Sequence, residues 1–227
     1  MKPIKLVILL ALISSSLSAY AQKAVWDSTF RPATFTIKAE QFKSYKSSSK
    51  DIIFLGNSIM ANTDWAELLE SSNVKNRGIS GDISYGILER LKDITDTKPA
   101  KIFLLIGIND ISRNIPDQQI LKNYSKIVSR IRSESPGTKI YLHTLMPVNY
   151  TFDKFKNHYG KDEHILFVNE AIRKMADQKM IFVIDLYPHF LDENKRMKVE
   201  LTHDGLHLTS AGYQVWAKLL REGNYLK

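Results

Sequence analysis

The chain reads Asp51-Ile52-Ile53-Phe54-Leu55-Gly56-Asn57-Ser58 at a point where a short apolar run ends in a glycine. A continuous run of this length, bounded by a turn signal, indicates a β-strand that is buried on both faces. Strands of this kind are typical of parallel sheets that helices cover on both sides. The segment therefore predicts an α/β fold, and it places Ser58 at the turn that follows a buried strand.

The same alternation continues toward the C-terminus. Further apolar runs predict strands at Val74–Arg77, Lys101–Ile106, Lys139–Leu145 and Met180–Leu186. Apolar residues at helical spacing predict helices over 65–69, 83–94, 120–131, 165–178 and 209–221, and a short helix over 39–45. Strands that alternate with helices indicate an α/β domain with a mainly parallel, five-stranded sheet. No internal repeat or linker divides the chain, so residues 22–227 predict a single domain.

The N-terminal 21 residues have the pattern of a secretory signal peptide. A basic start with Lys2 and Lys5 precedes an apolar run over 6–13 that is too short to span a bilayer, and Ala19-Tyr20-Ala21 matches a cleavage site before Gln22. An uncleaved anchor is the alternative, which the short apolar run disfavours. Removal of 21 residues from 227, with two lysines, would leave 206 residues and lower the net charge from +8 to +6. We therefore expect a secreted or periplasmic protein without a stable membrane anchor.

The composition is that of an ordinary globular protein, with 44% hydrophobic and 25% charged residues. The absence of cysteine excludes a disulfide scaffold, a zinc site with thiolate ligands and a cysteine nucleophile. Lysine and arginine are scattered, and of their densest groups, over 38–50 and 194–198, the first includes an acidic residue and serines. The excess of positive charge therefore predicts a solvated surface and no nucleic-acid partner.

Four short motifs lie where this fold gathers reactive groups, at the carboxyl edge of a parallel sheet. The first, Gly56-Asn57-Ser58-Ile59, places a serine hydroxyl at a strand-to-helix turn, where backbone N–H groups favour an anion. Ser58 can equally be interpreted as the N-cap of the helix. The G-x-S-x-G elbow of the α/β-hydrolases is not met, because Met60 occupies its last position.

Two loops follow the second and third predicted strands. In Gly78-Ile79-Ser80-Gly81-Asp82, a glycine lets backbone N–H groups approach a ligand closely. In Gly107-Ile108-Asn109-Asp110, the Asn109 amide can donate a hydrogen bond to a developing oxyanion. Taken singly, each loop favours a structural interpretation, namely a helix cap at Asp82 and an Asx turn at Asn109.

The fourth motif, Asp204-Gly205-Leu206-His207, precedes the last predicted helix. A carboxylate three residues before a histidine can bind one imidazole nitrogen and leave the other free to take a proton from a serine. A metal site on His203 and His207 is the alternative. Gly205 disfavours a helix between these histidines and no H-E-x-x-H motif is present, so the metal interpretation ranks low.

Together the motifs resemble those of the SGNH (GDSL) hydrolases, whose family name stands for the residues that match Ser58, Gly81, Asn109 and His207. The residues that flank Gly81 and His207 resemble those of one branch of the family, which contains the platelet-activating-factor acetylhydrolase subunits and bacterial acetylesterases. The resemblance covers roughly residues 51–220. One departure is Asn57, where the GDSL motif has aspartate. The resemblance implies a three-layer α/β/α sandwich of flavodoxin type, with no metal and no organic cofactor.

The resemblance also implies a mechanism and a class of substrate. Ser58 would be the nucleophile, His207 the general base and Asp204 its orienting carboxylate, with Ser58, Gly81 and Asn109 forming the oxyanion hole. The implied reaction is hydrolysis of a small-molecule or glycan carboxylic ester. Export and the lack of a long apolar lid favour removal of O-acetyl groups from a carbohydrate. The excess of lysine is compatible with an acidic one, such as a glycan with sialic or uronic acid.

Several alternatives remain at this stage. A lysophospholipase or acyl-thioesterase would use the same residues on longer acyl chains, and an O-acyltransferase would use a sugar hydroxyl in place of water. A non-catalytic carbohydrate-binding module is disfavoured, because all four family positions are present. The aromatic residues of loop 148–160 are expected either to stack on a sugar or to pack the loop onto the core. No pattern indicates a particular oligomeric state.

Overall fold

The computed structural model describes residues 26–227. The predicted signal peptide and its cleavage site lie outside the described residues. In the described part of the chain, no helix has the length and apolar character needed to cross a bilayer.

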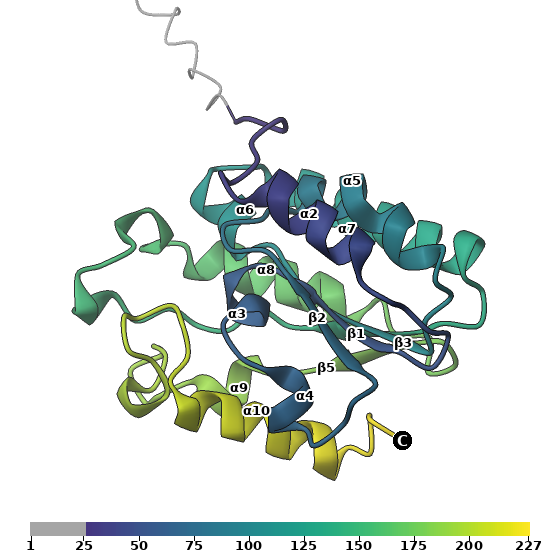
Figure 1. Cartoon of the computed structure of the whole chain (residues 1–227). Helices are drawn as coiled ribbons and strands as arrows, with labels where there is room; N and C mark the ends of the chain where they lie inside the picture. Colours follow the sequence, from purple (N-terminus) through teal and green to yellow (C-terminus); the bar gives the residue numbers. More distant parts are fainter. Residues whose placement is uncertain (1–25) are drawn as a thin grey trace, which may run out of the picture.

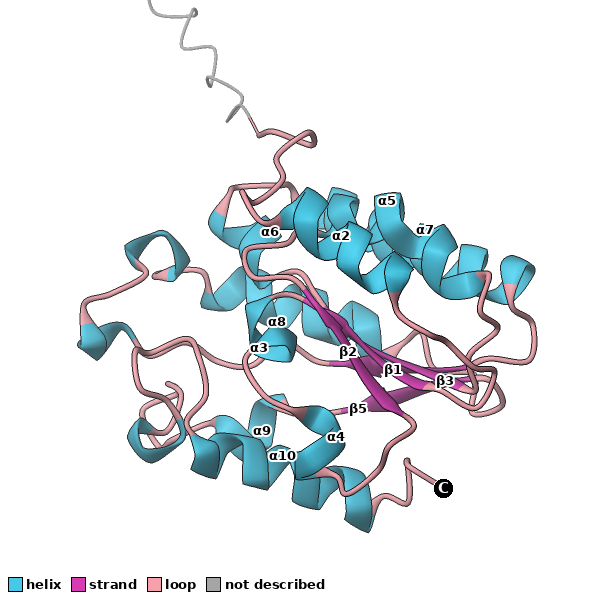
Figure 2. Ribbon diagram, viewed as in Figure 1, coloured by secondary structure: helices cyan, strands magenta, loops and turns pink. Residues whose placement is uncertain are grey.

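The centre of the fold is a five-stranded sheet in which every pair of neighbours is parallel (Figure 2). Its strands are β1 (Ile52–Gly56), β2 (Val74–Gly78), β3 (Lys101–Leu105), β4 (Lys139–His143) and β5 (Ile181–Ile184), in the order β2-β1-β3-β4-β5. The predicted α/β class and strand number are confirmed. The last three strands end one or two residues before the predicted limits, because their final apolar residues turn inward and cover the core beside the sheet edge.

Helices cover both faces of the sheet, so the protein is a three-layer α/β/α sandwich (Figure 1). One layer contains α2 (Phe35–Ser44), α5 (Ser84–Thr95), α7 (Asp117–Glu134) and α8 (Asp162–Arg173), which pack in sequence against one another. The other contains α4 (Trp65–Leu68), α9 (Tyr187–Phe190) and α10 (Ser210–Glu222). In this second layer Trp65 and Trp216 meet edge to face, with ring centroids 4.8 Å apart.

An aromatic row crosses the sheet and ties its strands together. Phe54, Phe103, Tyr141 and Phe182 occupy matching register positions on β1, β3, β4 and β5. The rings of successive residues stack with centroid distances of 4.8, 4.5 and 5.1 Å. Stacked aromatic pairs add to the stability from buried area, so this row helps to hold the strands in register.

The strand order places a topological switch point beside β1. The chain passes from β1 outward to β2 and then returns to β3 on the other side of β1. Ligands bind outside the carboxyl ends of the strands at such a point. Two short helices begin there, α3 (Ser58–Ala61) after β1 and α6 (Ile108–Ser112) after β3, and the second was not predicted.

Several predicted helix limits differ from the observed ones, and two of these differences have an identifiable cause. Helix α8 ends at Arg173 and does not reach 178, because the Asp177 carboxylate accepts the backbone N–H groups of Lys179, Met180 and Ile181 and forms a turn. Helix α2 begins at Phe35 rather than at 39, because burial of the Phe35 ring fixes the start of the helix on the core.

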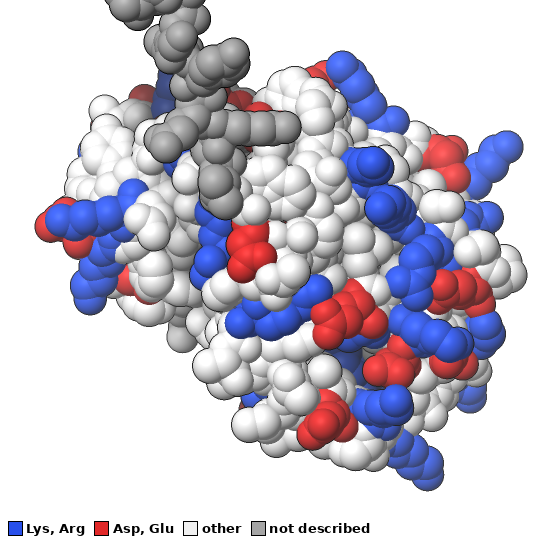
Figure 3. Space-filling model, turned by 90° about the horizontal axis from the view of Figure 1, so that it is seen from above, with Lys and Arg blue, Asp and Glu red and all other residues white. Residues whose placement is uncertain are grey.

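The face formed by the α2, α5 and α7 layer has a mixed charge pattern. Basic and acidic side chains alternate over it in Figure 3, without a continuous basic surface. Surface pairs such as Lys92 with Asp96 on α5, 2.7 Å apart, account for part of this pattern. This face fits the solvated surface that the sequence predicts.

Candidate active site

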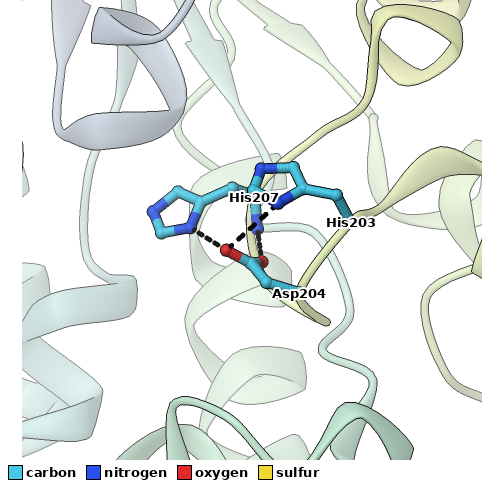
Figure 4. A group of neighbouring side chains, drawn as sticks. All are labelled: His203, Asp204 and His207. Atoms are coloured by element: carbon cyan, nitrogen blue, oxygen red, sulfur yellow. Dashed lines mark hydrogen bonds and ion pairs between the residues drawn. The ribbon is translucent and has the colours of Figure 1, made fainter.

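A serine and a distant pair of residues in one loop form a hydrogen-bonded series at the switch point. His207 Nε2 lies 2.9 Å from Ser58 Oγ, and His207 Nδ1 lies 2.7 Å from Asp204 Oδ2. Figure 4 shows the imidazole of His207 directed at the Asp204 carboxylate. Ser58 is 8% exposed and Asp204 7%. The structure thus brings together the three residues that the sequence predicts for nucleophile, base and orienting carboxylate.

Ser58 is held by the tight turn between β1 and α3. A Cβ on Gly56 would lie 2.3 Å from the Leu105 carbonyl oxygen, so only glycine fits at the end of β1. Asn57 is the N-cap of α3 and accepts the Ile59 N–H at 3.0 Å. The interpretation of Ser58 as an N-cap is therefore wrong. Since Asn57 has that position, the Ser58 hydroxyl is free to meet His207.

The loop that carries Asp204 and His207 is fixed by its own hydrogen bonds. Asp204 Oδ1 accepts the backbone N–H groups of Leu206 and His207 at 3.0 and 2.7 Å. Burial raises the pKa of the Asp204 carboxyl, but the hydrogen bonds from the His207 backbone and ring outweigh it, and the pKa lies below its ordinary value. The carboxylate therefore stays ionised beside the imidazole. Gly205 has a φ of +89°, and a Cβ there would lie 2.2 Å from the Asn149 carbonyl oxygen.

The three predicted oxyanion donors line one cavity with Ser58 Oγ. This cavity of about 300 Å³ is bounded by Ser58, Gly81, Asn109 and His207, among others. Neither the Ser58 nor the Gly81 N–H donates a hydrogen bond to another residue of 26–227. One N–H of the Asn109 amide donates to the Asp82 carbonyl at 3.0 Å, which leaves its second N–H available. The arrangement is suited to binding a negatively charged oxygen.

A buried ion pair supports the Gly81 loop. The Asp82 carboxylate lies 3.0 Å from Arg90 Nη2, and Arg90 also donates to the carbonyls of Gly56 and Arg77. The predicted helix cap at Asp82 is wrong, since Ile83 is the N-cap residue of α5 and Asp82 binds Arg90. Arg90 thereby connects the ends of β1 and β2 to the loop that holds Gly81. It was not among the predicted site residues, because its position on an amphipathic helix gives no signal of this role.

A second buried network supports Asn109. Asp110 accepts the backbone N–H of Ser84 at 3.0 Å and the Ser84 hydroxyl, and Asn123 Nδ2 donates to that hydroxyl at 2.8 Å. Burial raises the pKa of Asp110 to about 6, although the hydrogen bonds from Ser84 oppose this shift. The network joins α6, the start of α5 and α7, and so it fixes the helix on which Asn109 lies. The Asx turn expected at Asn109 is wrong, since its side chain bonds to Asp82 in another loop.

The aromatic residues of loop 148–160 divide between the cavity at Ser58 and the core. The Phe155 ring packs edge to face on the His207 imidazole at a centroid distance of 5.0 Å and lines the cavity. Tyr159 packs on the core and against Tyr150 at 6.3 Å. Packing onto the core is thereby confirmed for Tyr159, and stacking on a sugar stays a prediction, for which Phe155 is the residue at the cavity.

His158 is a site residue that the sequence analysis missed. It is 8% exposed, and its Nε2 lies 3.4 Å from the Asn109 amide oxygen. Burial lowers the pKa of His158 to about 4, so the imidazole is neutral near pH 7. A neutral Nε2–H that faces the amide oxygen favours the orientation in which the Asn109 NH₂ group faces Asp82 and the cavity. No motif signalled this residue, because a single histidine in an aromatic loop has no characteristic spacing.

His203, Asp204 and His207 have potential ligand atoms within 4.8 Å of one another, which raises the question of a metal. The 2.7 Å between His207 Nδ1 and Asp204 is a hydrogen-bond distance. Two ligands of a tetrahedral zinc ion lie about 3.3 Å apart at the usual bond lengths. His203 is exposed and its Nδ1 lies 3.7 Å from the same carboxylate. The donor set is thus arranged for hydrogen bonding, and we assign no metal to it.

The parallel α/β sandwich and the serine–histidine–aspartate series at its switch point are the features of a serine-type ester hydrolase. The chain belongs to the GDSL-like Lipase/Acylhydrolase family, whose sequence profile matches residues 54–215. The predicted relationship to the SGNH (GDSL) hydrolases is thereby confirmed.

Known proteins resemble the chain over most of its length. The platelet-activating factor acetylhydrolase IB subunit alpha2 of Rattus norvegicus is 26% identical over 183 residues, which span 78% of this chain and 77% of the relative. A solved structure from Streptococcus pneumonia, described as a platelet activating factor, is 28% identical, with a TM-score of 0.76 and coverage of 97% of this chain and 99% of that one. The acetyl xylan esterase AlAXEase shares the fold at 22% identity, with a TM-score of 0.64 and coverage of 76% and 98%.

Proposed function

We propose that this protein is a secreted serine esterase that removes O-acetyl groups from a carbohydrate. The observation that carries the proposal is the series from Ser58 Oγ through His207 to Asp204, with distances of 2.9 and 2.7 Å. A serine beside a histidine base, which a buried carboxylate orients, is the arrangement of an activated nucleophile.

Acylation of Ser58 is the first half of the proposed reaction. Asp204 accepts the Nδ1–H of His207, so Nε2 has its lone pair toward Ser58 and takes the hydroxyl proton as Oγ attacks the ester carbonyl. The carbonyl oxygen gains negative charge and accepts hydrogen bonds from the N–H groups of Ser58 and Gly81 and from the Asn109 amide. The bond between the carbonyl carbon and the sugar oxygen then breaks, His207 gives its proton to that oxygen, and the acetyl group remains on Ser58.

Deacylation repeats these steps with water. His207 removes a proton from a water molecule, and the water oxygen attacks the carbonyl carbon of the acetyl-enzyme. A second tetrahedral intermediate with a negatively charged oxygen forms. Collapse of that intermediate releases acetate and returns the proton to Ser58 Oγ. The residues that bind the oxyanion are the same in both halves, so each donor acts twice in one cycle.

Two observations support a short acyl group on a sugar. The cavity at Ser58 has about 300 Å³, at the lower limit of ordinary ligand pockets. The half-exposed Phe155 ring at its rim offers a surface on which a sugar ring can stack. The acetylhydrolase relatives and the acetyl xylan esterase with the same fold agree with an acetyl ester as substrate.

The first experiment compares hydrolysis of p-nitrophenyl esters, from acetate to palmitate, by the wild type and by Ser58→Ala. We expect a maximum at acetate and a loss of kcat of about 10⁴-fold or more in the variant, since the nucleophile is gone. Ser133→Ala is the matched control, because Ser133 is an exposed residue of α7 whose hydroxyl bonds only to the Arg130 carbonyl among described residues.

Other outcomes would replace the proposal. A maximum at long chains would identify a lysophospholipase or thioesterase. Formation of acetylated sugar faster than free acetate, with a sugar acceptor present, would identify an O-acyltransferase. Equal activity of Ser58→Ala and wild type would rule out the serine mechanism.

A further inference from the structure

A second cleft continues from the cavity at Ser58. It has about 460 Å³, and it shares Gly81, Asn109, Phe155 and His158 with that cavity. The remaining walls include Asp27 of the N-terminal segment and Arg113, the residue after α6. A sugar whose acetyl group reaches Ser58 would extend into this cleft, because the two spaces share one wall.

Arg113 is the notable side chain of this cleft. Its guanidinium group lies 3.1 Å from the centroid of the Phe30 ring, a cation–π contact. The Arg113 side chain is exposed, and among residues 26–227 its guanidinium group donates no hydrogen bond and has no carboxylate within 4.0 Å, whereas its backbone N–H donates to the carbonyls of α6. By contrast, the nearby Arg31 is paired with Glu89 and donates to three backbone carbonyls. Arg113 is thus positioned by stacking while its donors stay available.

The other charges of the cleft leave Arg113 as its main cation. Lys156 lies 3.0 Å from Asp153, in a pair that is largely exposed to solvent. Asp27 accepts the Thr29 N–H and hydroxyl at 2.7 and 2.6 Å, and these hydrogen bonds lower its pKa, so it is ionised. An anion in the cleft would therefore be attracted by Arg113 and repelled by Asp27. A planar guanidinium presents a fork of donors that matches a carboxylate.

We propose that Arg113 binds the carboxylate of an acidic sugar, so that the acetylated substrate is a uronic or sialic acid. This inference rests on the proposed esterase function and names its substrate class. Asn109 lies in the first turn of the short helix α6 and Arg113 directly follows the helix, so α6 sets the spacing between the oxyanion hole and the carboxylate site. Recognition of the acid would raise the productive binding of substrates whose carboxylate and acetyl group match this spacing.

The test measures acetate release from paired substrates that differ only in charge. One pair is O-acetylated methyl glucuronoside and its 6-methyl ester, and the other is O-acetylated N-acetylneuraminic acid and its methyl ester. For at least one pair we expect kcat/KM of the wild type to be about tenfold higher on the acid, the effect of roughly one charge-assisted hydrogen bond. The pair that shows this preference identifies the source of the carboxylate.

Two variants assign the preference to residues. Arg113→Gln is expected to lower the acid-to-ester ratio to about 1. Asp27→Asn, which keeps an acceptor for Thr29, is expected to raise the ratio because a repelling charge is removed. Arg132→Gln makes the same charge change near the C-terminal end of α7, away from the cleft, and should leave the ratio as in the wild type.

The outcomes separate this inference from the function on which it rests. Release of acetate at equal rates from acid and ester by the wild type would overturn the role of Arg113 and leave the esterase intact. A parallel loss on both substrates in Arg113→Gln would show a structural role only. No acetate from these sugars or from acetylated xylan, alongside rapid cleavage of p-nitrophenyl acetate, would overturn the carbohydrate substrate itself.

Discussion

Hydrogen bonds to the Asp204 carboxylate determine the orientation of the His207 ring. Both carboxylate oxygens are occupied, one by the His207 ring and the other by the backbone N–H groups of Leu206 and His207. The ring of His207 is thereby held with Nδ1 toward Asp204, and Nε2 has no orientation open to it other than toward Ser58. On the opposite wall, His158 is kept neutral by burial and contacts the amide of Asn109. The groups to which we assign the reaction are thus arranged in the structure without a substrate.

At this scale we predict the effect of Asn109→Ala. The amide is one of three proposed oxyanion donors, and loss of one such donor costs about 10²–10³ in kcat. The KM should change little, since the donor acts mainly on the charge that develops in the transition state. Steady-state kinetics on p-nitrophenyl acetate gives both values. A variant with the kcat of the wild type would exclude Asn109 from the oxyanion hole.

The elements that carry the site are short, and local backbone geometry fixes each of them. Helix α3 has four residues and is capped by the Asn57 side chain. Helix α6 has five residues and follows its N-cap residue Gly107, which has a φ of +123°. The loop before α10 turns at Gly205, where the backbone passes close to loop 148–160. Such elements cannot bury enough apolar surface by themselves, so the glycines and caps decide where the side chains lie.

Gly205→Ala tests this dependence on backbone geometry. The φ of +89° disfavours any L side chain, and the new Cβ would clash with the Asn149 carbonyl oxygen. We expect a loss of at least about 1 kcal/mol in the free energy of unfolding and a large fall in kcat, since Asp204 and His207 flank the turn. Gly137→Ala is the matched control, because no heavy atom lies within 4 Å of a Cβ there. Urea unfolding and esterase assays of both variants check the prediction, and similar behaviour of the two would contradict it.

For the molecule as a whole, the buried acids of the site lower the free energy of unfolding near neutral pH. Asp110 and Asp82 are buried acids beneath the oxyanion loops, and burial raises the pKa of both. The pKa of Asp110 is about 6 in the folded protein, so between about pH 4 and pH 6 the folded state holds a proton that the unfolded state has released. Stability from this group is therefore present at low pH and is lost as the pH rises through that window.

Asp110→Asn should remove this pH dependence. A shift of about two pKa units corresponds to about 3 kcal/mol, so the variant should gain about that much relative to the wild type between pH 4 and pH 7. Asparagine keeps an oxygen that can accept the Ser84 N–H and hydroxyl, which limits other losses. The measurement is urea unfolding of both proteins at the two pH values. A constant difference between them would show that Asp110 does not titrate in this range.

The sequence predicted those features that have a local cause. The buried strands have continuous apolar runs, so their number and approximate limits followed from residues such as Ile52–Leu55 and Lys101–Leu105. Helix α8 was extended too far, because the turn at Asp177 depends on its side chain rather than on apolar spacing. Helix α6 was missed since five residues give too short a pattern. The positions of Ser58, Gly81, Asn109, Asp204 and His207 after strands or before the last helix were predicted correctly.

By itself, the sequence determined the α/β class, the family and the residues that meet at the site, because apolar periodicity and short motifs involve residues that are close together in the chain. Only the tertiary structure decided which side chains support them. The Asp82–Arg90 pair, the contact of His158 with Asn109 and the place of Arg113 beside the cleft join residues from different elements. Contacts of this kind depend on how distant elements pack and on the free-energy cost of burying a charged group. The spacing of residues along the chain predicts neither.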